Sequence, residues 1–370
     1  MNFSEILQIY RPEEISEQIY SKTDKDVRIA LDKQILSLND FQAIISPAGS
    51  AFIEEMAGKS LQLTQQRFGK TIQLYVPIYL SNFCQNTCVY CGFAANVKQV
   101  RKLLNDAEIL EEVKVLKSFG YEHILLVTGE ASNKAGIEYF KHVFELIQPY
   151  FSLISIEVQP LEQIEYEELI KLGLNTVYLY QETYIKERYS KYHPSGKKSD
   201  FEYRLDSYER LGRAGVHRIG LGILAGLEDW RVDNFYTALH LSYLQKKYWK
   251  TKYSISFPRL RPHAGTFEPN IIMNDKELAQ LIFAYRLFDN DVEISLSTRE
   301  NPAFRDNMLK LGVTSMSAGS KTNPGGYSAD LESLEQFKVN DDRTVPQIIE
   351  MIKSKDYQPV MKNWDVFLQV

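Results

Sequence analysis

The stretch Gln73-Leu-Tyr-Val-Pro-Ile-Tyr-Leu-Ser-Asn-Phe-Cys-Gln-Asn-Thr-Cys-Val-Tyr-Cys-Gly-Phe93 decides most of what this chain of 370 residues can be. An apolar, strand-like run leads directly into Cys84, Cys88 and Cys91, the only cysteines in the sequence. A disulfide framework uses an even number of cysteines spread along the chain. A structural zinc site takes four ligands, and no further Cys or His follows closely enough to be the obvious fourth. Three thiolates suit a cubane iron–sulfur cluster, in which they hold three irons and leave one open.

Short β-branched and apolar runs recur beyond this stretch, and each is followed by a longer helical pattern. We predict strands over residues 73–80, 123–129, 153–160, 176–182, 218–224, 252–260, 292–298 and 314–319. The intervening helices are predicted over residues 106–119, 137–150, 161–172, 202–214, 232–249, 275–288 and 302–311. Eight strand-then-helix units are typical of a (βα)₈ TIM-type barrel, which makes the fold class α/β.

The chain divides into three parts on this reading. Residues 1–70 are predicted to be an N-terminal helical extension, residues 71–326 the barrel core, and residues 327–370 a C-terminal segment that docks on the barrel. Within that last segment Asp341-Asp-Arg343 reads as a turn, and residues 360–370 are apolar enough to pack on the barrel.

Composition and charge exclude several classes of function. The net charge of −5 gives no electrostatic case for nucleic acid. No apolar stretch is long enough to span a bilayer, and no signal peptide is visible at the N-terminus. Clustered thiols without a secretion signal favour a reducing cytoplasm.

Polar residues and glycines gather where the predicted strands end, and in a barrel these ends meet at one mouth. For any one of them, a helix cap or an ion pair at the rim is about as good an explanation as a binding role. Their coincidence at one mouth favours a site for a charged ligand of several parts. The segments are Thr128-Gly129-Glu130, Glu157-Val-Gln-Pro160, Tyr180-Gln-Glu-Thr183, residues 220–226, Pro258-Arg-Leu-Arg-Pro262, Ser297-Thr-Arg-Glu300 and residues 317–327.

These residues resemble a known family. The Cys-x₃-Cys-x₂-Cys motif resembles the signature of the radical S-adenosylmethionine (SAM) superfamily, and Thr128-Gly129-Glu130 is similar to its Gly-Gly-Glu motif. The whole set resembles the 2-iminoacetate synthases, the ThiH-type tyrosine lyases of thiamine-thiazole biosynthesis. The hydrogenase maturases of the HydG type are similar but carry a further C-terminal domain with more cysteines, and the tryptophan lyases of the NosL type are more distant. The segments are Tyr75-Val-Pro-Ile-Tyr-Leu-Ser-Asn82, Val127-Thr-Gly-Glu130, Glu157-Val-Gln-Pro160, Tyr180-Gln-Glu-Thr-Tyr184, Phe257-Pro-Arg-Leu-Arg-Pro262, Leu296-Ser-Thr-Arg-Glu300 and Lys321-Thr-Asn-Pro-Gly-Gly-Tyr327.

The resemblance implies one [4Fe-4S] cluster on Cys84, Cys88 and Cys91, with SAM bound at its open iron. The SAM amine would meet Thr128, Gly129 and Glu130, and the SAM carboxylate would meet Arg204, unless Arg204 is a surface residue of its helix. Glu182, or else Glu157, would bind the ribose, although either could pair with an Arg inside the barrel. Tyr90 and the segment 222–226, beginning at Gly222, would contact the adenine, whereas plain packing is the alternative for Tyr90.

L-Tyrosine is the implied substrate. A 5′-deoxyadenosyl radical would take a hydrogen from its amino group, and the Cα–Cβ bond would break to give 2-iminoacetate (dehydroglycine) and p-cresol. Arg299 is the expected anchor of the substrate carboxylate, with Tyr79 and Ser317 as further polar partners. Arg259 and Arg261 are alternative anchors, or else ion-pair partners of Glu268 or Glu300. No residue stands out as acceptor of the amine proton.

Two partners are also implied: thiazole synthase (ThiG), which would receive the unstable imine, and a flavodoxin or ferredoxin as reductant. The N-terminal helices and the C-terminal tail are candidate docking surfaces, and capping of the barrel is the alternative role of the helices. Two other classes remain open at this point. One is a radical SAM enzyme acting on another aromatic amino acid, and the other is a non-catalytic iron–sulfur carrier.

Overall fold

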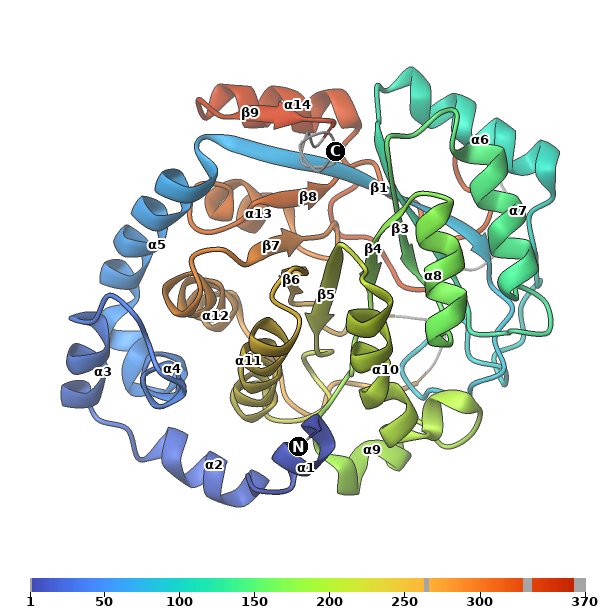
Figure 1. The fold of residues 1–370 in the computed structure, drawn as a ribbon. Coiled ribbons are helices and arrows are strands. Elements are labelled where there is room, and N and C mark those ends of the chain that lie inside the picture. Colours follow the sequence, from blue (N-terminus) through green and yellow to red (C-terminus); the bar gives the residue numbers. More distant parts are fainter. Residues whose placement is uncertain (1, 263–265, 329–334, 363–370) are drawn as a thin grey trace.

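Eight parallel strands close into a barrel in the computed structural model, which describes residues 2–262, 266–328 and 335–362 (Figure 1). Neighbouring strands pair in sequence order, and β8 pairs with β1 to complete the ring. The predicted (βα)₈ barrel is therefore confirmed. The strands are β1 (Thr71–Ser81), β2 (His123–Thr128), β3 (Leu153–Glu157), β4 (Leu174–Tyr178), β5 (Arg218–Gly222), β6 (Lys252–Ser256), β7 (Glu293–Leu296) and β8 (Ser315–Ser317).

Helices surround the barrel in the order that the sequence pattern predicts. They are α6 (Asp106–Ser118), α7 (Ile137–Ile147), α8 (Gln163–Lys171), α10 (Phe201–Ala214), α11 (Trp230–Lys247), α12 (Asp275–Phe288) and α13 (Pro302–Met308). Local sequence sets several of their ends. The side chain of Asn105 accepts from the backbone N–H of Glu108 to begin α6, and Gly215 ends α10 in the left-handed conformation with φ +78°. The short elements α9 (Lys186–Tyr192) and η2 (Lys197–Ser199), which were not predicted, follow β4.

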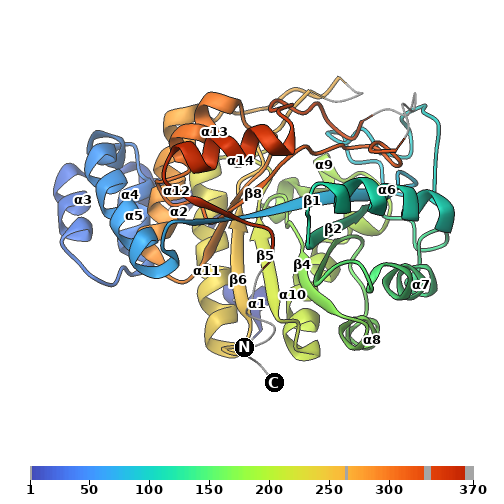
Figure 2. The same cartoon turned by 90° about the horizontal axis from the view of Figure 1, so that it is seen from above.

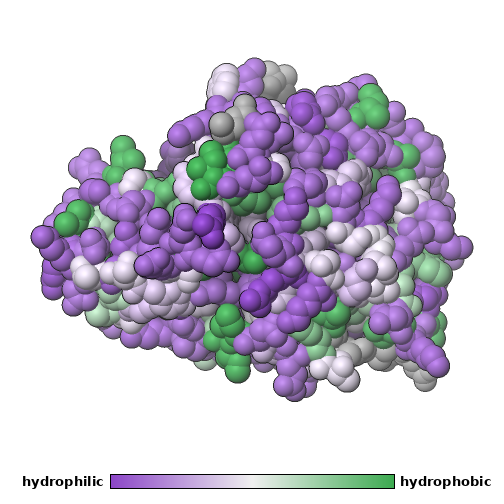
Figure 3. All heavy atoms as spheres, turned by 90° about the horizontal axis from the view of Figure 1, so that it is seen from below, coloured by the Kyte–Doolittle hydropathy of each residue, from purple (hydrophilic) through white to green (hydrophobic). Residues whose placement is uncertain are grey.

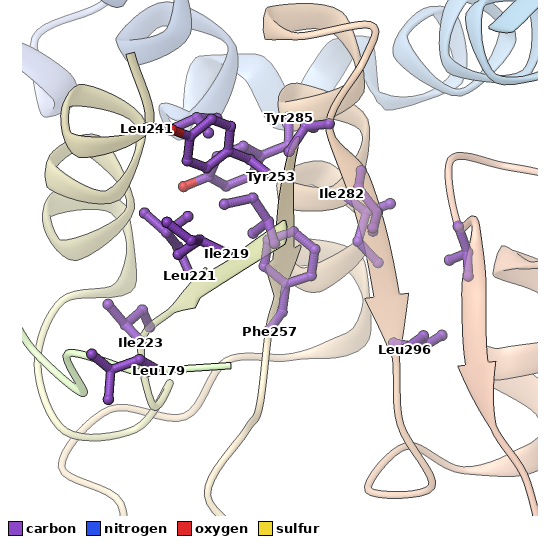
Figure 4. Packing of buried hydrophobic residues seen from close by; sticks show 14 of the residues in the cluster. Leu179, Ile219, Leu221, Ile223, Leu241, Tyr253, Phe257, Ile282, Tyr285 and Leu296 are labelled. Carbon is purple, nitrogen blue, oxygen red and sulfur yellow. The ribbon is translucent and has the colours of Figure 1, made fainter. Parts of the chain in front are cut away.

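The buried core lies between the strands and the surrounding helices. Ile219, Leu221 and Ile223 alternate along β5 and its continuation, so their side chains share one face of the strand. Figure 4 shows these side chains next to Leu179 and Phe257, in a cluster that also includes Leu241 of α11 and Tyr285 of α12. Removing this apolar surface from water is the main stabilising contribution to the barrel.

The N-terminal helices share that core with the barrel. The helices are α1 (Phe3–Leu7), α2 (Pro12–Tyr20), α3 (Asp24–Leu31), α4 (Leu38–Ile45), η1 (Ala48–Phe52) and α5 (Ile53–Phe68). In Figures 1 and 2, α3, α4 and α5 lie on the side of the barrel opposite α6 and α7, whereas α1 lies beside α10. Gln280 of α12 donates to the carbonyl oxygens of Ile44 and Ser46, both at 2.8 Å. Phe3 stacks on His240 of α11, with 3.7 Å between ring centroids.

The described part of the C-terminal segment contains two regular elements that were not predicted. It contains the helix α14 (Val345–Ser354) and a short strand β9 (Gln358–Val360), which pairs in parallel with Thr71–Gln73 at the start of β1. The predicted turn at Asp341-Asp-Arg343 is not observed. The carboxylate of Asp341 is instead buried and pairs with Arg305 and Arg343. The predicted docking of residues 360–370 falls outside the described residues beyond Lys362.

No helix in the described part of the chain is long and apolar enough to cross a membrane. Figure 3 shows one face of the molecule, on which hydrophilic side chains predominate and hydrophobic ones are scattered.

Candidate active site at the mouth of the barrel

A pocket opens at the carboxyl ends of the strands and encloses about 1470 Å³, including its open mouth. The loops after β1, β2, β4 and β7 contribute to its walls, together with the interior ends of the strands. Apart from Gly222 and the alternative anchor Arg259, the predicted site residues line it: Tyr79, Cys84, Cys88, Tyr90, Cys91, Thr128, Gly129, Glu130, Glu157, Glu182, Arg204, Arg261, Arg299 and Ser317.

The three cysteine thiols converge on one wall of this pocket. Cys88 is buried, while Cys84 and Cys91 are partly exposed. Burial raises the thiol pKa of all three, so they are poor thiolates until a cation neutralises them. No three His, Cys, Asp or Glu side chains within the described ranges come close enough together to hold a single metal ion. Thiols set apart in this way fit a polynuclear cluster, since each binds a different iron.

Arg101 fixes the shape of the cysteine loop. Its Nη1 donates to the carbonyl oxygens of Asn82 at 2.6 Å and Phe93 at 2.8 Å, which flank the three cysteines. Its Nη2 donates to the carbonyl oxygens of Ala94 at 2.6 Å and Val97 at 3.0 Å. One guanidinium therefore holds both ends of the loop, a role that sequence reasoning missed because Arg101 lies outside the motif.

The loop after β2 docks directly on the cysteine loop. The backbone N–H of Gly129 donates to the carbonyl of Ser81, and that of Gln85 donates to the carbonyl of Glu130, both at 2.9 Å. A Cβ at position 129 would lie 2.3 Å from the carbonyl oxygen of Phe83, so only glycine fits. Thr128 lines the pocket, and its hydroxyl is buried without a hydrogen-bond partner among the described residues.

Four charged side chains form a network beside the cysteines. Arg204 Nη1 lies 2.9 Å from Glu130 Oε1, and Lys198 Nζ lies 2.6 Å from Glu182 Oε1. Arg204 Nε also donates to the carbonyl of Tyr180 at 2.7 Å. Burial disfavours the ionised form of Glu130, but Arg204 and Lys198 outweigh this and lower its pKa. Arg204 is only 4% exposed, so the reading of Arg204 as a surface residue is wrong.

Glu182 occupies a strained position. Its φ of +71° is in the left-handed region, which a non-glycine residue seldom adopts. The surrounding structure holds it there: the N–H of Leu224 donates to its carbonyl at 3.0 Å. The carboxylate of Asp233 accepts from Thr183 Oγ1 at 3.0 Å and from the N–H of Tyr184 at 2.8 Å. The ion pairs of Glu182 with Lys198 and Arg204 fit the alternative that it pairs with neighbouring basic groups.

Tyr90 and Gly222 differ in what they do. The hydroxyl of Tyr90 is hydrogen-bonded to Nε2 of the buried His193 at 2.7 Å, which adds a polar contact to its packing. Gly222 does not line the pocket, but Leu224 of the predicted segment 222–226 does. A Cβ at position 222 would lie 2.5 Å from the carbonyl oxygen of Ser256 and 2.8 Å from the ring of Tyr180, so Gly222 permits close packing of β5 on its neighbours.

Arg299 lines this pocket and is partly exposed. Its guanidinium carbon lies 3.4 Å from the ring centroid of Phe337, and within the described ranges it has no carboxylate partner. Arg259 and Arg261 are instead both bound by Glu300, with Arg261 Nη2 at 2.9 Å from Glu300 Oε2. Arg259 and Arg261 are therefore ion-pair partners of Glu300, which was the predicted alternative to a role as carboxylate anchors.

Glu157 is the last residue of β3, and its register partner on β2 is Val127, which also lines the pocket. No hydrogen bond or ion pair ties its carboxyl to the residues that the structure describes. Burial raises its pKa to about 7, although Arg299 and Lys198 act in the opposite direction.

Gln336 and Phe337 close one side of the pocket and were not predicted. Tyr79 donates its hydroxyl to Gln336 Oε1 at 2.8 Å, and Gln336 Nε2 lies 3.9 Å from the sulfur of Cys91. Ser317 accepts from the N–H of Thr298 at 3.1 Å. No sequence motif marks Gln336 or Phe337, because they reach the site only through the path of the chain after the barrel.

Comparison with known proteins adds to this geometry. The radical SAM superfamily matches residues 78–239, and the biotin and thiamin synthesis associated domain matches residues 256–358. The chain is 46% identical to the 2-iminoacetate synthases of Escherichia coli (strain K12) and Salmonella typhimurium (strain LT2), over 96% of its length and 95% of theirs. Among solved structures it is similar to the hydrogenase maturase HydG of Carboxydothermus hydrogenoformans, with a TM-score of 0.85 and 30% identity over 98% of this chain and 83% of that one.

The identity and coverage confirm the predicted relationship and favour it over a HydG-like maturase. Members of the radical SAM superfamily use a [4Fe-4S] cluster and SAM. The chain belongs to the radical SAM superfamily and, within it, to the family of the 2-iminoacetate synthases.

Proposed function

We propose that this protein is a radical SAM lyase that cleaves the Cα–Cβ bond of L-tyrosine to 2-iminoacetate and p-cresol, for the thiazole of thiamine. SAM would be converted to 5′-deoxyadenosine and methionine. The observation that carries the proposal is that one pocket contains the three-cysteine loop, a buried network of acidic and basic groups, and Arg299, which has no acidic partner among the described residues.

Cys84, Cys88 and Cys91 would hold a single [4Fe-4S] cluster through three thiolates. Their convergence on one wall supports this, as does the way Arg101 and the loop after β2 fix the cysteine loop. When bound and reduced, the cluster and SAM together supply a 5′-deoxyadenosyl radical that removes a hydrogen atom from the substrate.

SAM would lie beside this wall. The unpartnered hydroxyl of Thr128 and the backbone of Gly129 and Glu130 suit its ammonium group. Arg204 suits its carboxylate, because a buried guanidinium binds a carboxylate strongly even when it already has one partner. Glu182 suits the ribose hydroxyls, and the strain at Glu182 is consistent with a functional position.

L-Tyrosine would bind through its carboxylate to Arg299, with Tyr79 and Ser317 as further polar partners. Arg299 suits this role because, among the described basic groups of the pocket, it is the one without an acidic partner. Tyr75, Tyr178 and Tyr180 line the pocket and would surround the substrate ring. Holding the carboxylate fixes the amino group at near-contact distance from the radical, which accounts for a large part of the rate.

The imine product hydrolyses in water, so we propose that it passes directly to thiazole synthase (ThiG). We also propose that a flavodoxin or ferredoxin reduces the cluster. Partial exposure of Cys84 and Cys91 supports electron entry from a docked protein at the mouth of the barrel.

An anaerobic assay of the reconstituted protein with dithionite, SAM and L-tyrosine tests the proposal by mass spectrometry. We expect p-cresol, 5′-deoxyadenosine and glyoxylate from the hydrolysed imine, and none of them from the Cys88→Ala variant. Formation of 5′-deoxyadenosine without p-cresol would mean that the substrate is another amino acid. Formation of neither, with an intact cluster, would support an iron–sulfur carrier.

A further inference from the structure

We infer that Glu157 is the group that accepts the proton of the substrate's ammonium, so that the substrate presents a neutral amine to the radical. The inference rests on the proposed function and adds to it a catalytic residue for the first chemical event at the substrate.

Glu157 lies at the carboxyl end of β3, at the mouth of the barrel. It ends β3 at the level of Val127 on β2, and both residues line the pocket. In a parallel sheet, register partners point to the same face, so the carboxyl points into the barrel mouth. The side chain is partly accessible to the pocket although it is surrounded by protein, which places it where a bound ligand would meet it.

Most charged side chains that line the pocket are already in ion pairs. Glu130 and Glu182 already have basic partners, and Arg261 already has an acidic one. Glu157 and Arg299 are left as the charged lining residues without an ion pair in the described part of the chain. Arg299 is also the charged group with the largest effect on Glu157. An anion and a cation, both open to one pocket, are complementary to an amino acid zwitterion, with the carboxylate at Arg299 and the ammonium at Glu157.

The substrate ammonium must lose a proton before the radical can take a hydrogen atom from its nitrogen. Loss of a hydrogen atom from nitrogen requires a neutral amine, whereas free tyrosine is an ammonium near neutral pH. A proton passes from the ammonium nitrogen to Glu157 Oε, the N–H electron pair stays on nitrogen as the lone pair, and no oxidant is needed. A base whose pKa is close to the working pH is best suited to this transfer, and that of Glu157 is about 7.

The groups facing Glu157 come from several elements. Arg299, Lys198 and Arg204 favour its ionised form, while Glu182 disfavours it. The phenols of Tyr79 and Tyr180 are also close enough for Glu157 to raise their pKa, after burial itself. These phenols stay neutral across the accessible pH range, so Glu157 is the group here that titrates near neutrality.

The test compares the cluster-loaded wild type with Glu157→Gln, Glu157→Asp and, as a matched surface control, Glu138→Gln, whose carboxylate is 82% exposed. The rate of p-cresol formation is measured from pH 6 to 9.5, and SAM binding is followed by the change it causes in the electron paramagnetic resonance spectrum of the reduced cluster. Glu157→Gln is expected to bind SAM normally and to lose roughly 100-fold in rate at pH 7. The loss should shrink about tenfold per pH unit as the free amine of tyrosine becomes more abundant.

Three results would overturn the inference: a Glu157→Gln rate within threefold of wild type, a loss that is the same at every pH, or loss of the SAM-dependent spectral change. The last result would assign Glu157 to the ribose. If the wild type itself forms no p-cresol, the proposed function fails and the inference falls with it. If the wild type and Glu138→Gln are active, only the role of Glu157 is being judged.

Discussion

Arg299 and Arg261 lie at the same rim, yet their electrostatic situations differ. Arg261 shares Glu300 with Arg259, so any ligand would have to compete with a carboxylate that is already bound. Arg299 rests on the ring of Phe337, which supports the guanidinium without neutralising it. At the scale of the residue, Arg299 suits a substrate carboxylate better than Arg261 because it has no acidic partner in the described part of the chain.

Replacing Arg299 by Ala is expected to lower kcat/KM for tyrosine by roughly 100-fold, because a charged hydrogen-bonded anchor is lost. The measurement is p-cresol formation against tyrosine concentration, with SAM binding followed separately. Arg213→Ala serves as the control, since Arg213 is an exposed residue of α10. An Arg299→Ala variant with unchanged tyrosine dependence would assign the carboxylate to another group.

Asp233 provides a prediction about stability and pH. Burial raises its pKa to about 8, although hydrogen bonds from Tyr184 and Thr183 act in the opposite direction. Between about pH 4, where the unfolded carboxyl ionises, and pH 8, the folded state binds the extra proton. This contribution to the free energy of unfolding therefore falls as pH rises, by about 1.4 kcal/mol per pH unit.

The Asp233→Asn variant keeps an oxygen that can accept both hydrogen bonds but cannot ionise. Thermal unfolding is measured for the two proteins between pH 5 and 8. The stability of the variant relative to wild type should increase as the pH rises. Parallel curves would mean that Asp233 does not titrate in this range.

Nearly all of the site residues predicted from the sequence line the pocket, but the sequence did not show which of them are paired. Residue type and family resemblance place Glu130, Glu157 and Glu182 at strand ends equally well. The ion-pair partners of Glu182 and Glu130 are Lys198 of η2 and Arg204 of α10. Only the folded chain therefore shows that, of the three, Glu157 has no basic partner among the described residues.

At the scale of the element, the cysteine loop is held by backbone contacts rather than by its own sequence. Arg101 binds four carbonyl groups across it, and Gly129 lets the loop after β2 approach the backbone of Phe83. Such support fixes the thiols before the cluster binds, so less ordering is required at assembly.

Replacing Arg101 by Ala should leave four loop carbonyls without this donor and destabilise the loop by about 2–4 kcal/mol. We expect iron bound per chain after reconstitution to fall by at least half, and a chelator to bleach the cluster faster. Lys98→Ala, an exposed position in the same loop, is the matched control. Wild-type iron content and bleaching rate in Arg101→Ala would show that the loop is fixed by other contacts.

The strands and helices of the barrel have a strong period and were predicted well, whereas the helix and the strand that follow the barrel were not predicted. Several predicted strands ran past their observed ends, because the apolar pattern continues into loops that line the pocket. The helix α14 was missed although its signals are present: Thr344 forms a capping box with Gln347, Pro346 lies in the first turn, and Ile348 and Ile352 are buried one turn apart. A mixed polar composition concealed that short pattern.

At the scale of the whole molecule, the barrel brings together residues from nearly its entire length. The cysteines follow β1, Arg299 follows β7, and Gln336 comes from beyond β8, yet all line one pocket. The N-terminal helices contribute side chains to the same core as the barrel, so they support this arrangement from outside. The site therefore depends on the closed ring and not on any single motif.

The most direct test of the account is the isotopic mass of 5′-deoxyadenosine formed with L-tyrosine in D₂O. Hydrogens on the amino nitrogen exchange with solvent, whereas those on carbon do not exchange under these conditions. If the pocket presents the amine to the radical, 5′-deoxyadenosine should gain one deuterium in step with p-cresol formation, and tyrosine deuterated on carbon should transfer none in H₂O. Deuterium that arrives only from carbon-bound positions would contradict the proposed placement of tyrosine between Arg299 and Glu157.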